Sequence, residues 1–224
     1  MAGILRNWRR KWRRKVEFTG RMREQARALL LDVVDVLAAA GVDYALDYGT
    51  LLGILRDGDL IPWDSDIDLA IPAGELPKLL AVLKTFRNRG RWISRRPFSH
   101  AYHYWTEADC RAIKIRSRRW FFFKGPLACD ICVKYPAPDG CRYWSSMRMV
   151  CKADRRFFEG RETVEYHGRR LNVPAHAAEY LATIYGDWRT PNPAYNPTRE
   201  DGTIVGPLAQ LGWHADGAKP APRA

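Results

Sequence analysis

Three aspartates at alternate positions constrain this chain more than any other feature. Asp64, Asp66 and Asp68 lie in the segment "WDSDIDLAIP", where apolar residues alternate as in a β-strand that ends at Pro72. On a strand this spacing places the carboxylates on one face, where their charge is costly unless a cation binds. Carboxylate oxygens suit Mg²⁺ or Mn²⁺. The pattern predicts a metal site with Asp66 and Asp68 as ligands, and with Asp64 as a further candidate.

Two other interpretations of the aspartate run were considered, a solvated loop and a calcium-binding loop. A calcium loop of the common helix–loop–helix type needs glycine at its sixth position. Counted from Asp64, the sixth residue is Leu69. The calcium interpretation therefore fails, while the solvated loop stays open on this run alone.

A glycine turn precedes the aspartates by about fifteen residues. Gly49 and Thr50 lie where a short strand, "VDYALDY", gives way to the helical segment "GTLLGILRDG". Glycine permits a tight turn, and the free amides of a helix start attract an anion. We expect this turn to bind a phosphate of the substrate, with the Thr50 hydroxyl as an additional donor. The segment lacks the Gly-Lys-Ser/Thr ending of a P-loop, so P-loop NTPase chemistry is not expected.

A third acid, Asp130, lies within the apolar segment "LACDICV". A bare carboxylate in an apolar strand costs several kcal/mol unless it is paired. Asp130 is therefore the candidate for a third metal ligand, or for the base that accepts a proton from the attacking hydroxyl. Lys114 and Arg116 alternate on "RAIKIRS" and would bind substrate phosphates, although a solvated strand face explains them equally well.

The order of expected elements predicts an α/β (α+β) fold, a mixed sheet flanked by helices. Helical periodicity marks residues 20–40, 73–86 and 174–186, whereas successive segments between 91 and 135 have the period of strands. Strand, helix, strand, helix and then several strands is typical of a mixed sheet. We expect one domain over residues 19–191, preceded by a basic arm (1–18) and followed by a Pro/Gly-rich tail (192–224).

The charge of the chain is concentrated at its N-terminus. Of the net +12, residues 1–27 contribute ten basic side chains against two acidic ones. Within 4–16 the apolar residues, two of them tryptophans, follow helical spacing, which is typical of a helix that lies on an anionic membrane. A solvated tail and a nucleic-acid-binding segment are the alternatives, and the absence of a base-reading module makes nucleic acid the less favoured partner.

Other features of the sequence favour a cytoplasmic protein, peripheral at most on the inner face of the membrane. No apolar run reaches the roughly 18–20 residues that a membrane-spanning helix needs. Five cysteines without regular spacing are typical of reduced thiols.

Two segments resemble the signatures of the LicD family of phosphorylcholine and fukutin-related sugar-phosphate transferases. They are "YALDYGTLLGILRDGDLIPWDSDIDLAIP" (44–72) and "VPAHAAEYLATIYGDWRTP" (173–191). The resemblance implies a nucleotidyltransferase-like fold. In such a fold the Gly49–Thr50 turn and the strand acids Asp66 and Asp68 act together with a third carboxylate, here Asp130.

The same resemblance implies an activity. A LicD-type enzyme transfers a phospho-alcohol from a CDP-linked donor to a hydroxyl of a cell-surface glycan or of its lipid-linked precursor. Two alternatives stay open. One is a nucleotidyltransferase acting on RNA, protein or a small molecule, and the other is a non-catalytic basic module that binds membrane or nucleic acid.

Overall fold

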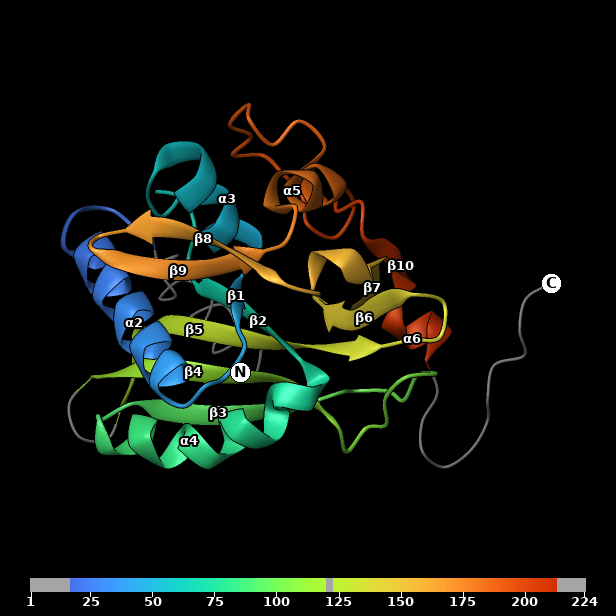
Figure 1. The fold of residues 1–224 in the computed structure, drawn as a ribbon, viewed down its shortest axis with the longest axis horizontal. Helices are drawn as coiled ribbons and strands as arrows, with labels where there is room; N and C mark the ends of the chain where they lie inside the picture. The colour runs from blue at the N-terminus through green and yellow to red at the C-terminus, as the bar shows by residue number, and fades with distance from the viewer. Residues whose placement is uncertain (1–16, 120–122, 213–224) are drawn as a thin grey trace, which may run out of the picture.

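The computed structural model describes residues 17–119 and 123–212 as a mixed α/β fold, which confirms the predicted fold class (Figure 1). The helices are α2 (Gly20–Ala39), α3 (Tyr48–Asp57), α4 (Leu76–Asn88), α5 (Ala177–Tyr185) and α6 (Leu208–Leu211). The strands are β1 (Ala45–Leu46), β2 (Ile67–Pro72), β3 (Trp92–Pro97), β4 (Cys110–Arg119), β5 (Phe123–Pro136), β6 (Cys141–Ser146), β7 (Met149–Asp154), β8 (Arg161–Tyr166), β9 (Arg169–Pro174) and β10 (Ile204–Pro207).

Eight strands form one sheet around β5. Strand β2 pairs with β5 in parallel, and β4 pairs with its other edge in antiparallel orientation. Strand β1 extends the sheet beyond β2 and β3 extends it beyond β4, while the far end of β5 continues into β6, β7 and β10. Since β5 has fourteen residues, it carries both halves of the sheet, and its centre meets β2 and β4 at the same level.

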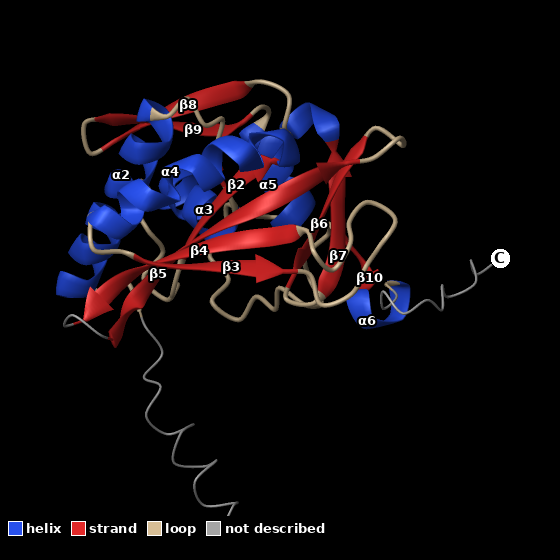
Figure 2. Ribbon diagram, turned by 90° about the horizontal axis from the view of Figure 1, so that it is seen from below, coloured by secondary structure: helices blue, strands red, loops and turns tan. Residues whose placement is uncertain are grey.

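Helices α2 and α4 cover one face of the sheet (Figures 1 and 2). Along α2, buried residues such as Leu30, Val33 and Leu37 follow helical spacing and meet the buried Ile113 and Ile131 of β4 and β5 in one apolar core. Each such side chain contributes roughly 1.5–3 kcal/mol when it is fully removed from water. Side chains alternate between the two faces of a strand, so the neighbours of Ile113 and Ile131 in β4 and β5 point away from the helices. That opposite face carries charged side chains, among them Lys114 and Asp130.

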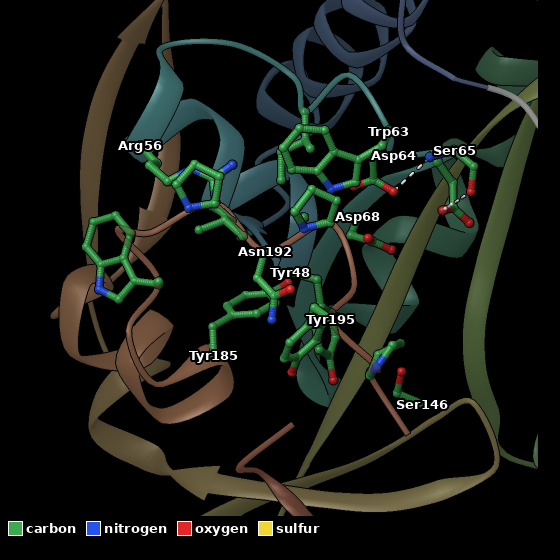
Figure 3. Close-up of a pocket in the computed structure, with 18 of the residues that line it drawn as sticks. Tyr48, Arg56, Trp63, Asp64, Ser65, Asp68, Ser146, Tyr185, Asn192 and Tyr195 are labelled. Atoms are coloured by element: carbon green, nitrogen blue, oxygen red, sulfur yellow. Dashed lines mark hydrogen bonds between the residues drawn. The ribbon is translucent and has the colours of Figure 1, made fainter. Parts of the chain in front are cut away.

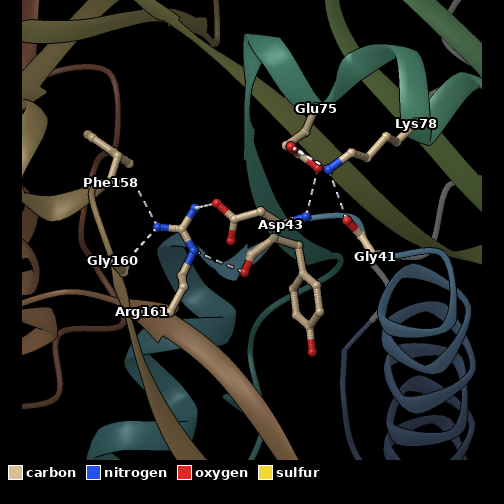
Figure 4. A network of polar contacts seen from close by, with 8 residues as sticks. Gly41, Asp43, Glu75, Lys78, Phe158, Gly160 and Arg161 are labelled. Atoms are coloured by element: carbon tan, nitrogen blue, oxygen red, sulfur yellow. Dashed lines mark hydrogen bonds and ion pairs between the residues drawn. The ribbon is translucent and has the colours of Figure 1, made fainter.

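The β8–β9 ribbon is tied to the start of β1 by a polar network (Figure 4). Arg161 of β8 donates to Asp43 Oδ2 at 2.8 Å and to the Phe158 carbonyl at 3.0 Å. Glu75 accepts from the Asp43 amide at 3.0 Å, and Lys78 pairs with Glu75 at 2.9 Å. The network fixes the chain just before the strand that leads into α3.

The C-terminal segment contributes to the sheet. Strand β10 pairs antiparallel with β7, and Leu208 of α6 is buried. At the other end of the described chain, Phe18 is buried in the main core. The predicted basic helix within 4–16 lies outside the described residues. In the ranges that the structure describes, no helix is long and apolar enough to span a bilayer.

Candidate active site

Three charged side chains form a row across the centre of the sheet. Asp68 of β2 is the register partner of Asp130 on β5, and Asp130 is in turn the partner of Lys114 on β4. Register partners direct their side chains to the same face of a sheet. The structure thus brings together the strand acid and the third carboxylate that were sought from sequence, although they are separated by 62 positions in the chain.

Lys114 lies between two of the acids. Its Nζ is 2.7 Å from Asp130 Oδ2 and 3.8 Å from Asp66 Oδ2. The other oxygen of Asp130, Oδ1, is buried and has no hydrogen-bond partner among the described residues. The lysine expected to bind substrate phosphate is therefore engaged with the carboxylates.

Burial and mutual repulsion favour the protonated forms of two of these acids. Burial raises the pKa of Asp68 well above its usual value, and the charges of Asp66, Asp64 and Asp130 raise it further. Burial also raises the pKa of Asp130, in spite of the opposing hydrogen bond from Lys114. Such crowding of acids is typical of a site built to receive positive charge.

The Gly49–Thr50 turn lies where β1 passes into α3, as its sequence indicated. Asp47 is the N-cap of α3, and its carboxylate accepts from the Tyr48 amide at 3.0 Å. A Cβ at Gly49 would collide with the Asp64 carboxylate. The close approach that glycine permits here is therefore made by Asp64, which also lines the cleft described below.

Thr50 has a different contact from the one expected. Its side chain is about 1% exposed, and Oγ1 accepts a hydrogen bond from the Asp68 amide at 2.9 Å. The hydroxyl therefore holds β2 against α3, and Thr50 is not among the residues that line the cleft. Since a threonine hydroxyl both accepts and donates, donation from Thr50 to a phosphate stays a prediction.

A buried ion pair lies beside the turn. Lys134 of β5 pairs with Asp47 at 2.8 Å, and both side chains are about 1% exposed. The Tyr180 hydroxyl donates to Asp47 Oδ1 at 2.9 Å, and the Lys134 ammonium lies 3.5 Å from the centre of the Trp144 ring. Neither member of the pair was singled out from sequence, because a lysine near the end of a strand usually faces water.

A cleft of about 930 Å³ opens over the acids. Asp66, Asp68 and Asp130 line it, and segment 185–197 forms another of its walls. Figure 3 shows Asp64 and Asp68 on one side of the cleft, with Arg56 and Tyr185 on the other. The Pro-rich segment after α5, which was expected to be a tail, thus supplies a wall of the site in its first residues.

The basic residues that line the cleft differ from those predicted. Arg56 and Arg111 line it, whereas neither Lys114 nor Arg116 does. Arg111 sits where the pairing of β3 and β4 shifts register, between the pairs that involve Ala112 and Cys110. Strict alternation would place Arg111 on the core face, so the irregularity explains why the sequence did not reveal it.

The donor set of the site is suited to a hard divalent cation. It offers carboxylate oxygens only, one of them the buried and unpartnered Asp130 Oδ1, in a place where negative charge is crowded. As the side chains stand, no three His, Cys, Asp or Glu residues in the described ranges are close enough together to hold an ion. Lys114 supplies the compensating charge between Asp66 and Asp130 in this arrangement.

Fold and site together define a mixed-sheet domain with strand carboxylates facing a helix-start turn, as in nucleotidyltransferase-like proteins. Residues 41–176 match the LicD/FKTN/FKRP nucleotidyltransferase domain, and the chain belongs to this family. The second signature-like segment, 173–191, begins inside the matched range, and its residues 177–191 lie outside it.

Individual relatives resemble shorter parts of the chain. Over 50 residues the chain is 58% identical to the ribitol 5-phosphate transferase FKRP of Mus musculus and to that of Homo sapiens. This match covers 22% of the chain and 9% of each relative. Among solved structures, the lincomycin-bound lincosamide adenylyltransferase LnuA is similar, with a TM-score of 0.42 and 16% identity over 68% of this chain and 82% of that one.

Proposed function

We propose that the chain is a metal-dependent phosphotransferase. It would move a phospho-alcohol from a CDP-linked donor to a hydroxyl of a glycan or of a lipid-linked glycan precursor. The observation that carries the proposal is the juxtaposition of Asp68, Asp130 and Lys114 on three adjacent strands, beneath a cleft lined by two arginines. Membership of the LicD/FKTN/FKRP family and the similarity to FKRP support the phospho-alcohol as the transferred group.

In the reaction the acceptor oxygen attacks the phosphorus that bears the alcohol. The bond from this phosphorus to the bridging oxygen breaks, and CMP leaves with that oxygen. Arg56 and Arg111, which line the cleft, would bind the charged phosphates of the donor. Asp130 is the candidate to accept the proton of the attacking hydroxyl, because its raised pKa makes its carboxylate a stronger base than an exposed one.

Asp66 and Asp68 would hold Mg²⁺ or Mn²⁺, with Asp130 nearby and Asp64 beside Gly49 as a further oxygen donor. When bound, the ion would neutralise charge on the diphosphate and favour departure of CMP. Lys114 would keep Asp130 and Asp66 close together, since its ammonium is in contact distance of both.

Transfer of a nucleoside monophosphate is the alternative that the same acids would serve. A screen with Mg²⁺ separates the two reactions, using CDP-choline, CDP-ribitol, CDP-glycerol and the nucleoside triphosphates as donors. Liquid chromatography with mass detection would follow the nucleotide products. CMP formed from one of the CDP-linked donors supports the proposal. Pyrophosphate released from a triphosphate, without CMP from any CDP-linked donor, would assign the chain to nucleotidyl transfer instead.

A further inference from the structure

The hairpin of β4 and β5 has exposed cationic and aromatic side chains where the two strands come together. Arg118 of β4 is the register partner of Lys124 on β5, and both side chains are exposed. Figures 1 and 2 show the end of β4 and the start of β5 at the end of the sheet far from β6, β7 and β10. We call Arg118, Phe123 and Lys124 the hairpin end.

An irregularity in the pairing sets the hairpin end apart from the acids. The register of β4 and β5 shifts between Arg116 and Arg118. Gly125 lies in the irregular stretch, where a Cβ would collide with Ser117. Such a bulge bends the strand and increases its twist. The directions of Arg118 and Lys124 therefore follow from their own pairing and exposure, and not from the alternation of side chains earlier in β4.

The two cations of the hairpin end repel each other. Residues directly opposite on paired antiparallel strands direct their side chains to the same face, where like charges are destabilising. Within residues 17–119 and 123–212, neither Arg118 nor Lys124 forms an ion pair with a carboxylate. Lys124 Nζ lies 4.9 Å from the centre of the Trp92 ring, a cation–π contact that attracts the ammonium but leaves its charge in place. The pair is therefore suited to an anionic partner.

Phe123 adds an exposed apolar ring. It is 67% exposed, the largest fraction among the exposed large apolar residues of the described ranges. Because Phe123 directly precedes Lys124, the two side chains leave β5 toward opposite faces. In the sequence the two strands are separated by Trp120, Phe121 and Phe122, which lie outside the described ranges and are not counted in the hairpin end. The hairpin end thus presents a ring on one face and two cations on the other.

We propose that the hairpin end binds the surface of an anionic membrane. Aromatic rings are enriched at the boundary between headgroups and acyl chains, and lysine and arginine are attracted to anionic headgroups. A hairpin with these side chains on its two faces can enter the boundary end-on, with the ring in the apolar layer and the cations among the headgroups. A single-stranded nucleic acid is instead bound in a groove where rings and cations act together.

Binding at the hairpin end would leave the cleft open. Asp130 and Phe123 lie on the same strand, seven positions apart. At about 3.3 Å per residue this separation is at most about 23 Å. The acids would therefore lie near the membrane surface but outside it. The inference does not depend on the transfer reaction, since it concerns where the chain is held.

Co-sedimentation of the full chain with vesicles tests the role of the two cations. Vesicles of phosphatidylcholine alone are compared with vesicles that also contain about 30% phosphatidylserine, an anionic lipid. R118Q/K124Q removes both cations of the hairpin end. Its matched control, R148Q/K152Q, removes two exposed cations on the β6–β7 hairpin, at the other end of the sheet.

We expect R118Q/K124Q to bind the anionic vesicles at least fivefold more weakly than the wild type, while R148Q/K152Q stays within twofold of it. The difference between the two variants should shrink at high salt, because salt screens the charge of the membrane surface. Equal losses in both variants would show a dependence on net charge alone and would overturn the proposal.

The role of the ring is tested separately in the same assay. Phe123→Ser should weaken binding to the anionic vesicles at least threefold. Val205→Ser is the matched control, since Val205 is an exposed apolar residue of β10. Circular dichroism confirms that each variant keeps the wild-type fold. Wild-type affinity in F123S, or an equal loss in V205S, would contradict membrane insertion of the ring. Tighter binding of a uridine oligonucleotide than of the anionic vesicles, weakened in R118Q/K124Q, would assign the hairpin end to nucleic acid instead.

Discussion

Lys134 Nζ lies 2.8 Å from Asp47 Oδ2, at a position where both side chains are about 1% exposed. Asp47 caps α3 and its backbone amide donates to the Asp68 carbonyl at 3.0 Å. The buried pair is therefore connected through one residue both to the turn that carries Gly49 and to the strand that carries the acids. Its contribution to the site is to fix the position of that turn.

Replacing Lys134 by methionine should destabilise the fold strongly. It leaves the Asp47 carboxylate buried without its cation, which typically costs about 3–5 kcal/mol. The double variant D47N/K134M removes both charges and should recover part of that loss in urea unfolding. If K134M is as stable as the wild type, or if the double variant is less stable than K134M, the pair does not hold the turn in place.

Gly49→Ala should impair turnover, because a Cβ at Gly49 collides with the Asp64 carboxylate and must displace it. We expect CMP formation to fall at least tenfold while the circular dichroism spectrum stays unchanged. Gly74→Ala is the matched control, since a Cβ there meets no atom within 4 Å. Wild-type turnover in G49A would show that the position of Asp64 is not needed.

Thr50→Val should destabilise the protein by about 1–3 kcal/mol, because it leaves the Asp68 amide without its acceptor. Thr50→Ser keeps the hydroxyl and should retain most of the stability. The two variants are compared by urea denaturation. A larger loss in Thr50→Ser than in Thr50→Val would indicate that packing of the Thr50 methyl group, and not the hydrogen bond, is responsible.

The acids could be found from sequence because their signal is local. Alternation within 64–72 marks a strand face, and Asp130 is conspicuous in an apolar segment. The buried pair could not be found in this way, because Lys134 meets Asp47 only when β5 lies beside β2 and α3 is in place. Arg111 was not predicted because its direction depends on a register shift. Residues 192–197 were assigned to the tail because their Pro-rich composition is also that of a tail.

Asp59 provides a pH-dependent test of how the fold is held together outside the site. Burial raises its pKa, but hydrogen bonds from Arg27 and Tyr166 outweigh burial and lower it from 3.8 to about 2. In the native state the Asp59 carboxylate thus binds a proton less readily than it does in the unfolded chain. The stabilisation is complete above about pH 4 and is lost as the pH falls toward 2.

Asp59→Asn should therefore cost about 2 kcal/mol at pH 7, in proportion to the pKa difference. The difference from the wild type should shrink as the pH falls from 4 to 2. Asp35→Asn is the control, because the pair of Asp35 with Arg169 is about half exposed and such pairs contribute roughly 0–1 kcal/mol. A constant difference between D59N and the wild type across this pH range would contradict the assignment.

We expect Asp66 and Asp68 to bind the divalent cation that phospho-alcohol transfer needs. The rate of CMP formation measures this requirement directly. It is measured from the CDP-linked donor that the wild type accepts, with Mg²⁺ and after chelation by EDTA, in the wild type and in D66N and D68N. We predict that chelation abolishes CMP formation and that each variant lowers it at least a hundredfold. CMP formation at the wild-type rate in D68N, or in the presence of EDTA, would contradict the proposed metal site.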